Sequence, residues 1–306
     1  MSSPDTYTGW IDPNPPDTTD PRADRVLVLA GAALTFVVLC ALIGVVLAKR
    51  TGLLGSADPD RPPVALIAAN DVGDAPFMPS VVVAPIEIAG TVASDMASFT
   101  AQLPRSAGRG ARLVAGTQRG LYGSVGDAAV CDVPAIANFL DAYPDRSASW
   151  ARAIGIEQQK VPYYLNTLTP VVLNSDTWVT LSLFSGGHTE SVQAVLEAGN
   201  ALLVDEIGVP RVHCASGNPL LPPANIDLSS MEPTGDKWPH FSPNEVLAVA
   251  YTGPGPSAPA VSVFELRDVR TGDVIERIPG RTIAIGEDPA GWVPNLAAMN
   301  VPPSHK

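Results

Sequence analysis

The sequence predicts a single transmembrane α-helix followed by one α+β globular domain, with short helices in the middle and a β-meander and a hairpin after them. Three observations predict this fold class. Residues 26–48 carry no charge, residues 132–168 place apolar side chains at helical spacing, and residues 171–278 contain short apolar runs separated by Gly, Pro and Asn. The 46% hydrophobic content excludes a mainly disordered chain, and the 31 Pro and 26 Gly argue against helical bundles and coiled coils.

The chain divides into five predicted parts. They are a disordered acidic Pro-rich tail (1–24), a transmembrane helix (25–50), a stalk (51–63), the α+β domain (64–285) and a flexible tail (286–306). The 23 uncharged residues would form a helix of about 34 Å, enough to cross a hydrocarbon core of about 30 Å. A secretory signal has a shorter apolar core nearer the N-terminus, so we expect an uncleaved anchor.

Two observations disagree about the side of the membrane on which the domain lies. The flanking charges slightly favour a cytoplasmic domain, since two basic residues precede the helix and three follow it. Cys131 and Cys214 are the two cysteines outside the apolar segment, and an even pair suits an oxidising compartment. A bridge would close a loop of about 83 residues, worth up to about 4.5 kcal/mol. Two separate buried thiols remain the alternative, and we expect the domain outside the cytoplasm.

The first part of the domain is expected to mix short strands with turns. Residues 64–69 form a continuous apolar run, and the β-rich segment 81–88 is interrupted by Pro85. Between them, Asp71 and Asp74 lie in a turn cluster. Their spacing lacks the alternating oxygen ligands of an EF-hand, so a plain turn is expected there rather than a calcium site.

Three helices are predicted in the middle of the chain. Asp132 can cap the first, which ends before Pro144, and Gly155 can end the second after residue 154. The third covers 161–168 and stops at Pro170. Trp150, Tyr163 and Tyr164 fall at helical spacing, which favours core packing over an aromatic ligand site.

Strands are predicted after Pro170. They cover 171–173, 178–184, 192–197, 201–205, 211–214 and 246–251, followed by a hairpin of 261–269 with 274–278. The runs from 192 to 214 follow one another closely, which favours a β-meander.

The net charge of −12 argues against a nucleic-acid partner. A local exception is the basic stretch 105–119, in which we predict candidate anion contacts for phosphate head groups or an anionic polymer, namely Arg105, Arg109, Arg112 and Arg119. The alternative is a solvated loop.

No catalytic, metal or cofactor site is predicted. Ser124 lacks the glycine two residues earlier that a nucleophile elbow requires, and no histidine can be assigned to it as a base. His213 and Cys214 are adjacent on a predicted strand, so their side chains point to opposite faces and cannot share one metal ion. We therefore expect a protein that is not an enzyme and binds no cofactor.

The segment 208–220, Gly-Val-Pro-Arg-Val-His-Cys-Ala-Ser-Gly-Asn-Pro-Leu, resembles a stretch in an uncharacterised family of actinobacterial membrane-anchored proteins with a domain of unknown function. The resemblance covers most of 64 to about 280, including Trp238-Pro239, and implies the same order of tail, membrane helix and domain, with no assigned activity. The family pattern carries a second cysteine where this chain has Ser216, so a zinc-knuckle or dithiol site does not carry over.

Within this motif we expect backbone roles rather than a binding loop, because Gly and Pro have special conformations. The residues concerned are Gly208, Pro210, Gly217, Asn218 and Pro219.

Together these observations predict a single-pass protein of the cell membrane whose domain is an extracytoplasmic envelope interaction or sensing module. Its expected partners are the lipid bilayer and an envelope polymer or another membrane protein. The alternatives are an envelope hydrolase with an unrecognised site and a cytoplasmic domain tethered to the inner membrane face.

Overall fold

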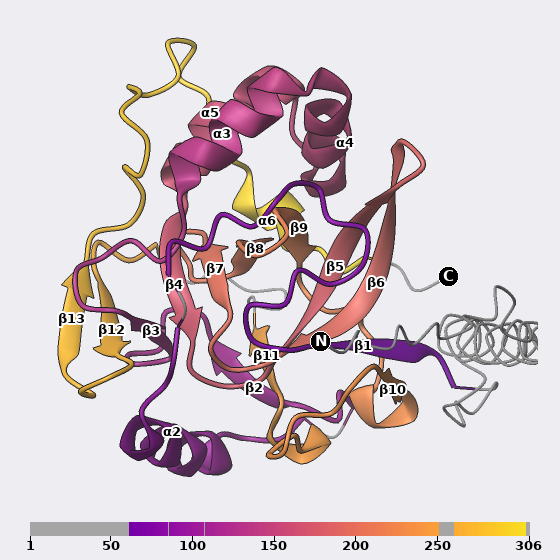
Figure 1. Cartoon of the computed structure of the whole chain (residues 1–306), viewed down its shortest axis with the longest axis vertical. Helices are drawn as coiled ribbons and strands as arrows, with labels where there is room; N and C mark the ends of the chain where they lie inside the picture. The colour runs from indigo at the N-terminus through magenta and orange to yellow at the C-terminus, as the bar shows by residue number, and fades with distance from the viewer. Residues whose placement is uncertain (1–60, 85, 107, 251–259, 304–306) are drawn as a thin grey trace, which may run out of the picture. The chain divides into compact units, whose positions relative to one another are not determined.

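The structure is a computed structural model that describes residues 61–84, 86–106, 108–250 and 260–303 (Figure 1). Within these residues no helix is long and apolar enough to cross a membrane. The segment 26–48, for which the sequence predicts such a helix, lies outside them.

The predicted fold class is wrong for the part of the chain that the structure describes. Instead of a transmembrane helix with an α+β domain, this part is a mixed sheet with few helices and is mostly β. Thirteen strands form the sheet in the order β10-β1-β6-β5-β9-β8-β7-β4-β3-β12-β13, and β11 pairs with both β2 and β5.

Apart from the long pair β5 and β6, the strands are short. They are β1 (Pro63–Ile67), β2 (Arg112–Ala115), β3 (Tyr122–Ser124), β4 (Thr169–Leu173), β5 (Thr177–Ser185), β6 (His188–Leu196), β7 (Ala201–Val204), β8 (Pro210–His213), β9 (Asn218–Leu221), β10 (Glu232–Thr234), β11 (Leu247–Ala250), β12 (Phe264–Asp268) and β13 (Val274–Arg277).

The expected β-meander is also wrong, because β6 does not continue into β7. It pairs with β5 as a long hairpin and with β1 in parallel, whereas β7 pairs with β4 and β8. Further parallel pairs join β1 with β10, β2 with β11 and β3 with β12, all distant in sequence. The predicted hairpin of β12 and β13 is confirmed.

The three predicted helices are confirmed, and their ends follow local capping rules. They are α3 (Val133–Ala142), α4 (Pro144–Ile154) and α5 (Val161–Thr167). The Asp132 side chain accepts a hydrogen bond from the amide of Ala135, and Gly155 ends α4 with a φ of +76°. Helix α2 (Gly90–Gln102) is not predicted from the sequence, and its N-cap Ala89 gives no side-chain cap.

Most strands are buried on both faces, which explains their continuous apolar runs. In β4, Val171 and Leu173 point into one hydrophobic cluster and Val172 into another. The first cluster also contains Leu181 of β5 and Leu202 of β7, two strands that are not neighbours in the sheet. These strands therefore share one core.

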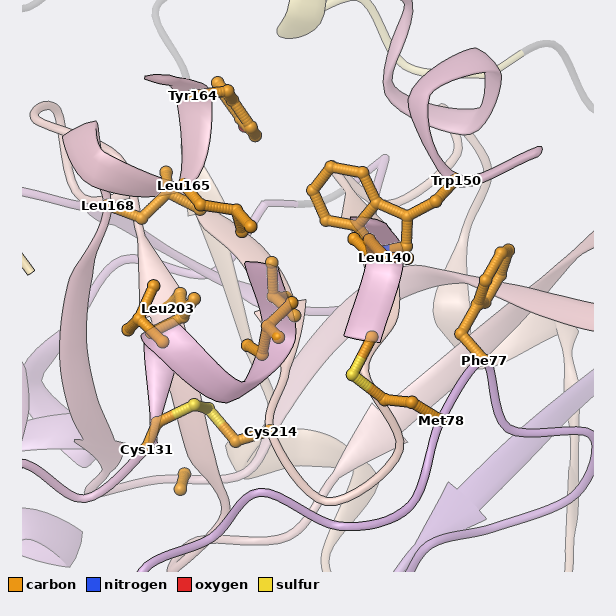
Figure 2. Packing of buried hydrophobic residues seen from close by; sticks show 14 of the residues in the cluster. Phe77, Met78, Cys131, Leu140, Trp150, Tyr164, Leu165, Leu168, Leu203 and Cys214 are labelled. Carbon is orange, nitrogen blue, oxygen red and sulfur yellow. A yellow bond between two sulfur atoms is a disulfide. The ribbon is translucent and has the colours of Figure 1, made fainter. Parts of the chain in front are cut away.

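The second cluster lies between the sheet and the helices α3, α4 and α5, which gather at one end of the domain in Figure 1. Trp150 and Tyr164 are fully buried there with ring centroids 6.2 Å apart, so their predicted core role is confirmed. Figure 2 shows both rings above the disulfide.

Residues 286–303, for which we predict a flexible tail, contain the short helix α6 (Leu296–Met299). Asp288, Met299 and Asn300 are buried in this segment, and Trp292 and Leu296 pack against the helical core. The segment therefore contributes to the packing of the domain.

Candidate functional site

Cys131 and Cys214 form a disulfide with their Cα atoms 5.9 Å apart (Figure 2). Cys131 immediately precedes the cap of α3, and Cys214 directly follows β8. Both side chains are buried in the core beneath the helices. The predicted bridge is confirmed, and it joins the helical layer to the sheet.

The loop after β8 holds the family motif in place through contacts within the domain. A Cβ at Gly217, where φ is +65°, would overlap the side chain of Met78. The carbonyl of Gly217 accepts a hydrogen bond of 2.9 Å from the indole of Trp150, and the Asn218 side chain accepts one of 2.8 Å from the amide of Phe77. These contacts fit the expected backbone roles.

The other end of the motif packs just as closely. Gly208 has a φ of +76°, and a Cβ there would collide with the backbone of Gly116. The carbonyl of Gly208 accepts a 2.6 Å hydrogen bond from the hydroxyl of Tyr122. Pro210 begins β8 and Pro219 lies within β9, where it pairs with Val212.

His213 lies between Ser216 and Asn200 in a buried polar network. Its Nδ1 is 2.9 Å from the Ser216 hydroxyl, and its Nε2 is 2.9 Å from Oδ1 of Asn200. Because Nδ2 of Asn200 donates to the carbonyl of Glu197, the amide oxygen faces the ring. His213 therefore donates through Nε2 and accepts the hydroxyl proton of Ser216 at Nδ1.

This order of hydroxyl, imidazole and amide is that of an activated nucleophile with its base and orienting residue. The network differs from such a site in being buried, since Ser216 is 0% exposed and His213 is 1% exposed. Desolvation also lowers the pKa of His213 to about 4, so the ring is neutral. The network is therefore closed to solvent in this structure, and its hydrogen bonds support the loop.

A buried ion pair lies at the other end of β8. Arg211 and Asp205 are both buried, and their guanidinium and carboxylate groups are 2.8 Å apart. The Asp205 carboxylate also accepts from the amides of Ile207 and Val209. The guanidinium additionally donates to the carbonyl of Met299 and to the Asn300 side chain, so the pair is satisfied by hydrogen bonds from several segments.

The four arginines proposed as anion contacts make contacts within the domain. Arg105 and Arg112 both lie near Glu245, at 3.9 and 3.1 Å, and Arg112 also donates to the carbonyls of Ala101 and Leu103. The structure thus brings these two together. Anion binding by the stretch stays a prediction.

The remaining two arginines lie apart from that pair. Arg109 stacks its guanidinium 5.2 Å from the centroid of the buried Trp178 ring and donates to Asn225. Arg119 is exposed and pairs with Glu265 of β12 at 3.0 Å.

The sequence does not indicate the buried carboxylate of Asp176, directly before β5. The Asp176 side chain accepts hydrogen bonds from the amide of Ala198 at 3.0 Å and from the indole of Trp238 at 2.9 Å. Desolvation raises the pKa of Asp176 to about 6, and the nearby Glu197 adds to this effect. The contact ties the Trp238-Pro239 element to the sheet, but its partners lie 22 and 62 residues away, so no local pattern indicates it.

A surface cleft is lined by charged side chains of both signs, Arg281 with Glu206 and Glu287. It holds about 510 Å³ and lies between the end of α5, Glu206 and residues 279–287. Its side chains come from three distant parts of the chain, so the sequence does not indicate it. Asn166 and Thr167 supply neutral polar groups at the cleft, and the Thr167 hydroxyl donates to the carbonyl of Tyr164.

In the described part of the chain, no group of three or more His, Cys, Asp or Glu side chains is placed to hold a metal ion.

Comparison with known proteins places this fold in a family of uncharacterised domains. Residues 112–280 match the domain of unknown function DUF6777. The chain belongs to this family, and the matched residues include the disulfide, the buried network and the ion pair. Neither a curated protein nor a solved structure gives a significant match.

Proposed function

We propose that this chain acts on the outer side of the cell membrane as an interaction or sensing module without catalytic activity. The observation that carries the proposal is the buried disulfide between Cys131 and Cys214. Disulfides persist in oxidising compartments and are rare in a reducing cytosol. The bridge therefore supports an extracytoplasmic location, against the slight opposite preference of the flanking charges.

The uncharged run 26–48 supports a position at the membrane, although it lies outside the described residues. An envelope polymer or another membrane protein is the class of partner that suits this position. A cytoplasmic domain tethered to the inner membrane face is disfavoured because its thiols would be kept reduced.

Alkaline phosphatase fused after Lys306, compared with a fluorescent protein fused at the same place, tests the location. We expect an active phosphatase and a dim fluorescent fusion. Thiol labelling of the denatured, unreduced full chain should modify one of its three cysteines, and all three after reduction. An inactive phosphatase with a bright fluorescent fusion, or three thiols before reduction, would exclude the proposal.

The absence of catalysis is proposed because the one arrangement of hydroxyl, imidazole and amide identified in the described residues is sealed. The full-length protein should not hydrolyse generic ester, peptide or glycan substrates. Activity that Ser216→Ala abolished, while the exposed-residue control Ser94→Ala retained it, would establish the hydrolase alternative instead.

A further inference from the structure

The cleft beside α5 has a wall that is organised before any ligand arrives. Asn166, near the end of α5, accepts a 2.9 Å hydrogen bond from the amide of Ile283 through its side chain and a 2.7 Å bond from the amide of Arg281 through its carbonyl. Its Nδ2 also donates to the carbonyl of Ile285. One residue thus holds three residues of the opposite wall, which lowers the ordering cost of binding.

Arg281 has an unusual backbone conformation within this wall. Its φ is +58°, in the left-handed region that non-glycine residues rarely adopt. The preceding Gly280 also has a positive φ and packs against the backbone of residues 166 and 167. The conformation places an exposed, charged side chain at the cleft at the cost of local strain, a combination that is common at binding sites.

The charges at the cleft have both signs. Arg281 supplies a guanidinium, while Glu206 and Glu287 supply carboxylates, and all three residues are exposed. Within the described chain, none of these three side chains forms an ion pair or a hydrogen bond. They are therefore available to a ligand, and Ile283 and Ile285 add apolar surface beside them.

Two other clefts of similar size lack this combination. In the cleft of about 480 Å³ beside Ile88, the cation Arg270 is already paired with Asp268 at 3.4 Å. The cleft of about 440 Å³ between α3 and Gln158 contains Asp141 but no cation.

We propose that the cleft beside α5 binds a small zwitterion with an aliphatic part, such as a short peptide with free ends. Its carboxylate is bound by Arg281, its ammonium by Glu206 and Glu287, and its aliphatic side chain contacts Ile283 and Ile285. The volume of about 510 Å³ lies within the usual range for small-ligand sites. The inference deepens the proposed function by naming a ligand class. It rests on the proposed function only for the compartment in which the protein meets this ligand.

The test uses full-length protein with glycyl-L-leucine and L-alanyl-L-valine as probes, followed by calorimetry and by ligand-observed NMR. We expect saturable binding with a Kd of about 1 mM or tighter. The N-acetylated dipeptides lack the ammonium and the dipeptide amides lack the carboxylate, so each should bind at least about tenfold more weakly, the change expected for losing one charged contact.

Two variants assign the contacts. Glu287→Gln should weaken binding of the free dipeptide and reduce the ratio of its affinity to that of the N-acetylated form. Arg281→Asn should reduce the ratio of the affinity of the free dipeptide to that of the dipeptide amide. Asn is chosen because it tolerates the left-handed conformation. The exposed controls Glu190→Gln and Arg152→Gln lie outside the cleft and should bind like the parent, and thermal unfolding checks that every variant is folded.

Absence of saturable binding by both dipeptides would overturn the proposal, as would binding that neither cleft variant changes. If binding fails while the phosphatase fusion is active, the extracytoplasmic role stands and only the ligand class is lost. If binding succeeds while the phosphatase is inactive, the cleft stands and the location is withdrawn.

Discussion

Asp176 and His213 give the folded state opposite responses to acid. The pKa of Asp176 is raised from 3.8 to about 6, so the folded state holds its proton more tightly than the unfolded chain. Its contribution to the free energy of unfolding therefore grows as the pH falls from 6 towards 3.8. The pKa of His213 is lowered from 6.5 to about 4, so its contribution is present above pH 6.5 and is lost as the pH falls towards 4.

The two contributions oppose each other between pH 4 and 6, and Asp176→Asn should separate them. Without the carboxylate, the free energy of unfolding should fall on acidification more steeply than in the parent, by on the order of 2 kcal/mol over this range. Urea unfolding of the parent and the variant at several pH values measures this pH dependence of the free energy of unfolding. The exposed Asp95→Asn variant should follow the parent profile, and an Asp176→Asn profile that did so too would show that this carboxylate is not perturbed.

At the scale of elements, the segment around α6 completes the hydrogen bonding of Arg211. The carbonyl of Met299 and the side chain of Asn300 accept from a guanidinium that has no exposed surface. A buried charge that loses a partner keeps its full desolvation penalty. The short helix therefore stabilises a side chain about ninety residues earlier in the chain.

Asn300→Ala should consequently lower the free energy of unfolding by about 2 kcal/mol, the usual range for a hydrogen bond to a charged group. The neighbouring exposed residue provides a matched control, since Val301→Ala should change it by less than about 0.5 kcal/mol. Equal effects of the two substitutions in chemical denaturation would mean that α6 does not support Arg211.

Helices and strands differ in what the local sequence reveals. The bounds of α3 and α4 follow from Asp132, Pro144 and Gly155, because caps and i, i+4 contacts lie within a few residues. The partners of β6 do not follow, because its parallel neighbour β1 is about 130 residues away and both faces of its second half, residues 193–196, are buried. A continuous apolar run is compatible with several neighbours, and proximity in sequence wrongly favoured a meander.

At the scale of the whole molecule, the disulfide links the helical layer to the sheet across a sequence separation of 83 residues. Replacing both Cys131 and Cys214 by Ala should lower the free energy of unfolding by about 2 to 4.5 kcal/mol, mainly because the unfolded chain gains conformational entropy without the cross-link. Reducing the parent should produce a similar loss, and a reductant should not destabilise the double variant further. No loss on either treatment would show that the bridge does not stabilise the domain.

The candidate sites divide in the same way as the secondary structure. The cysteine pair could be predicted because only two cysteines lie outside the apolar segment. For the 208–220 motif, the Gly and Pro residues predict backbone roles, and the close contacts at Gly208 and Gly217 fit this prediction. The network of His213 with Asn200 and the cleft at Arg281 could not be predicted, since their members lie on separate strands, helices and loops that only the tertiary structure brings together.

By itself, the sequence determined the features that depend on neighbouring residues or on composition: three helices, the Asp132 and Gly155 caps, one hairpin, a cysteine pair and membership of an uncharacterised domain family. The tertiary structure decided which strands pair, which histidine is sealed and where charges of both signs meet in one cleft. The physical reason is that strand pairing and burial are satisfied between segments distant along the chain, so no local pattern records them.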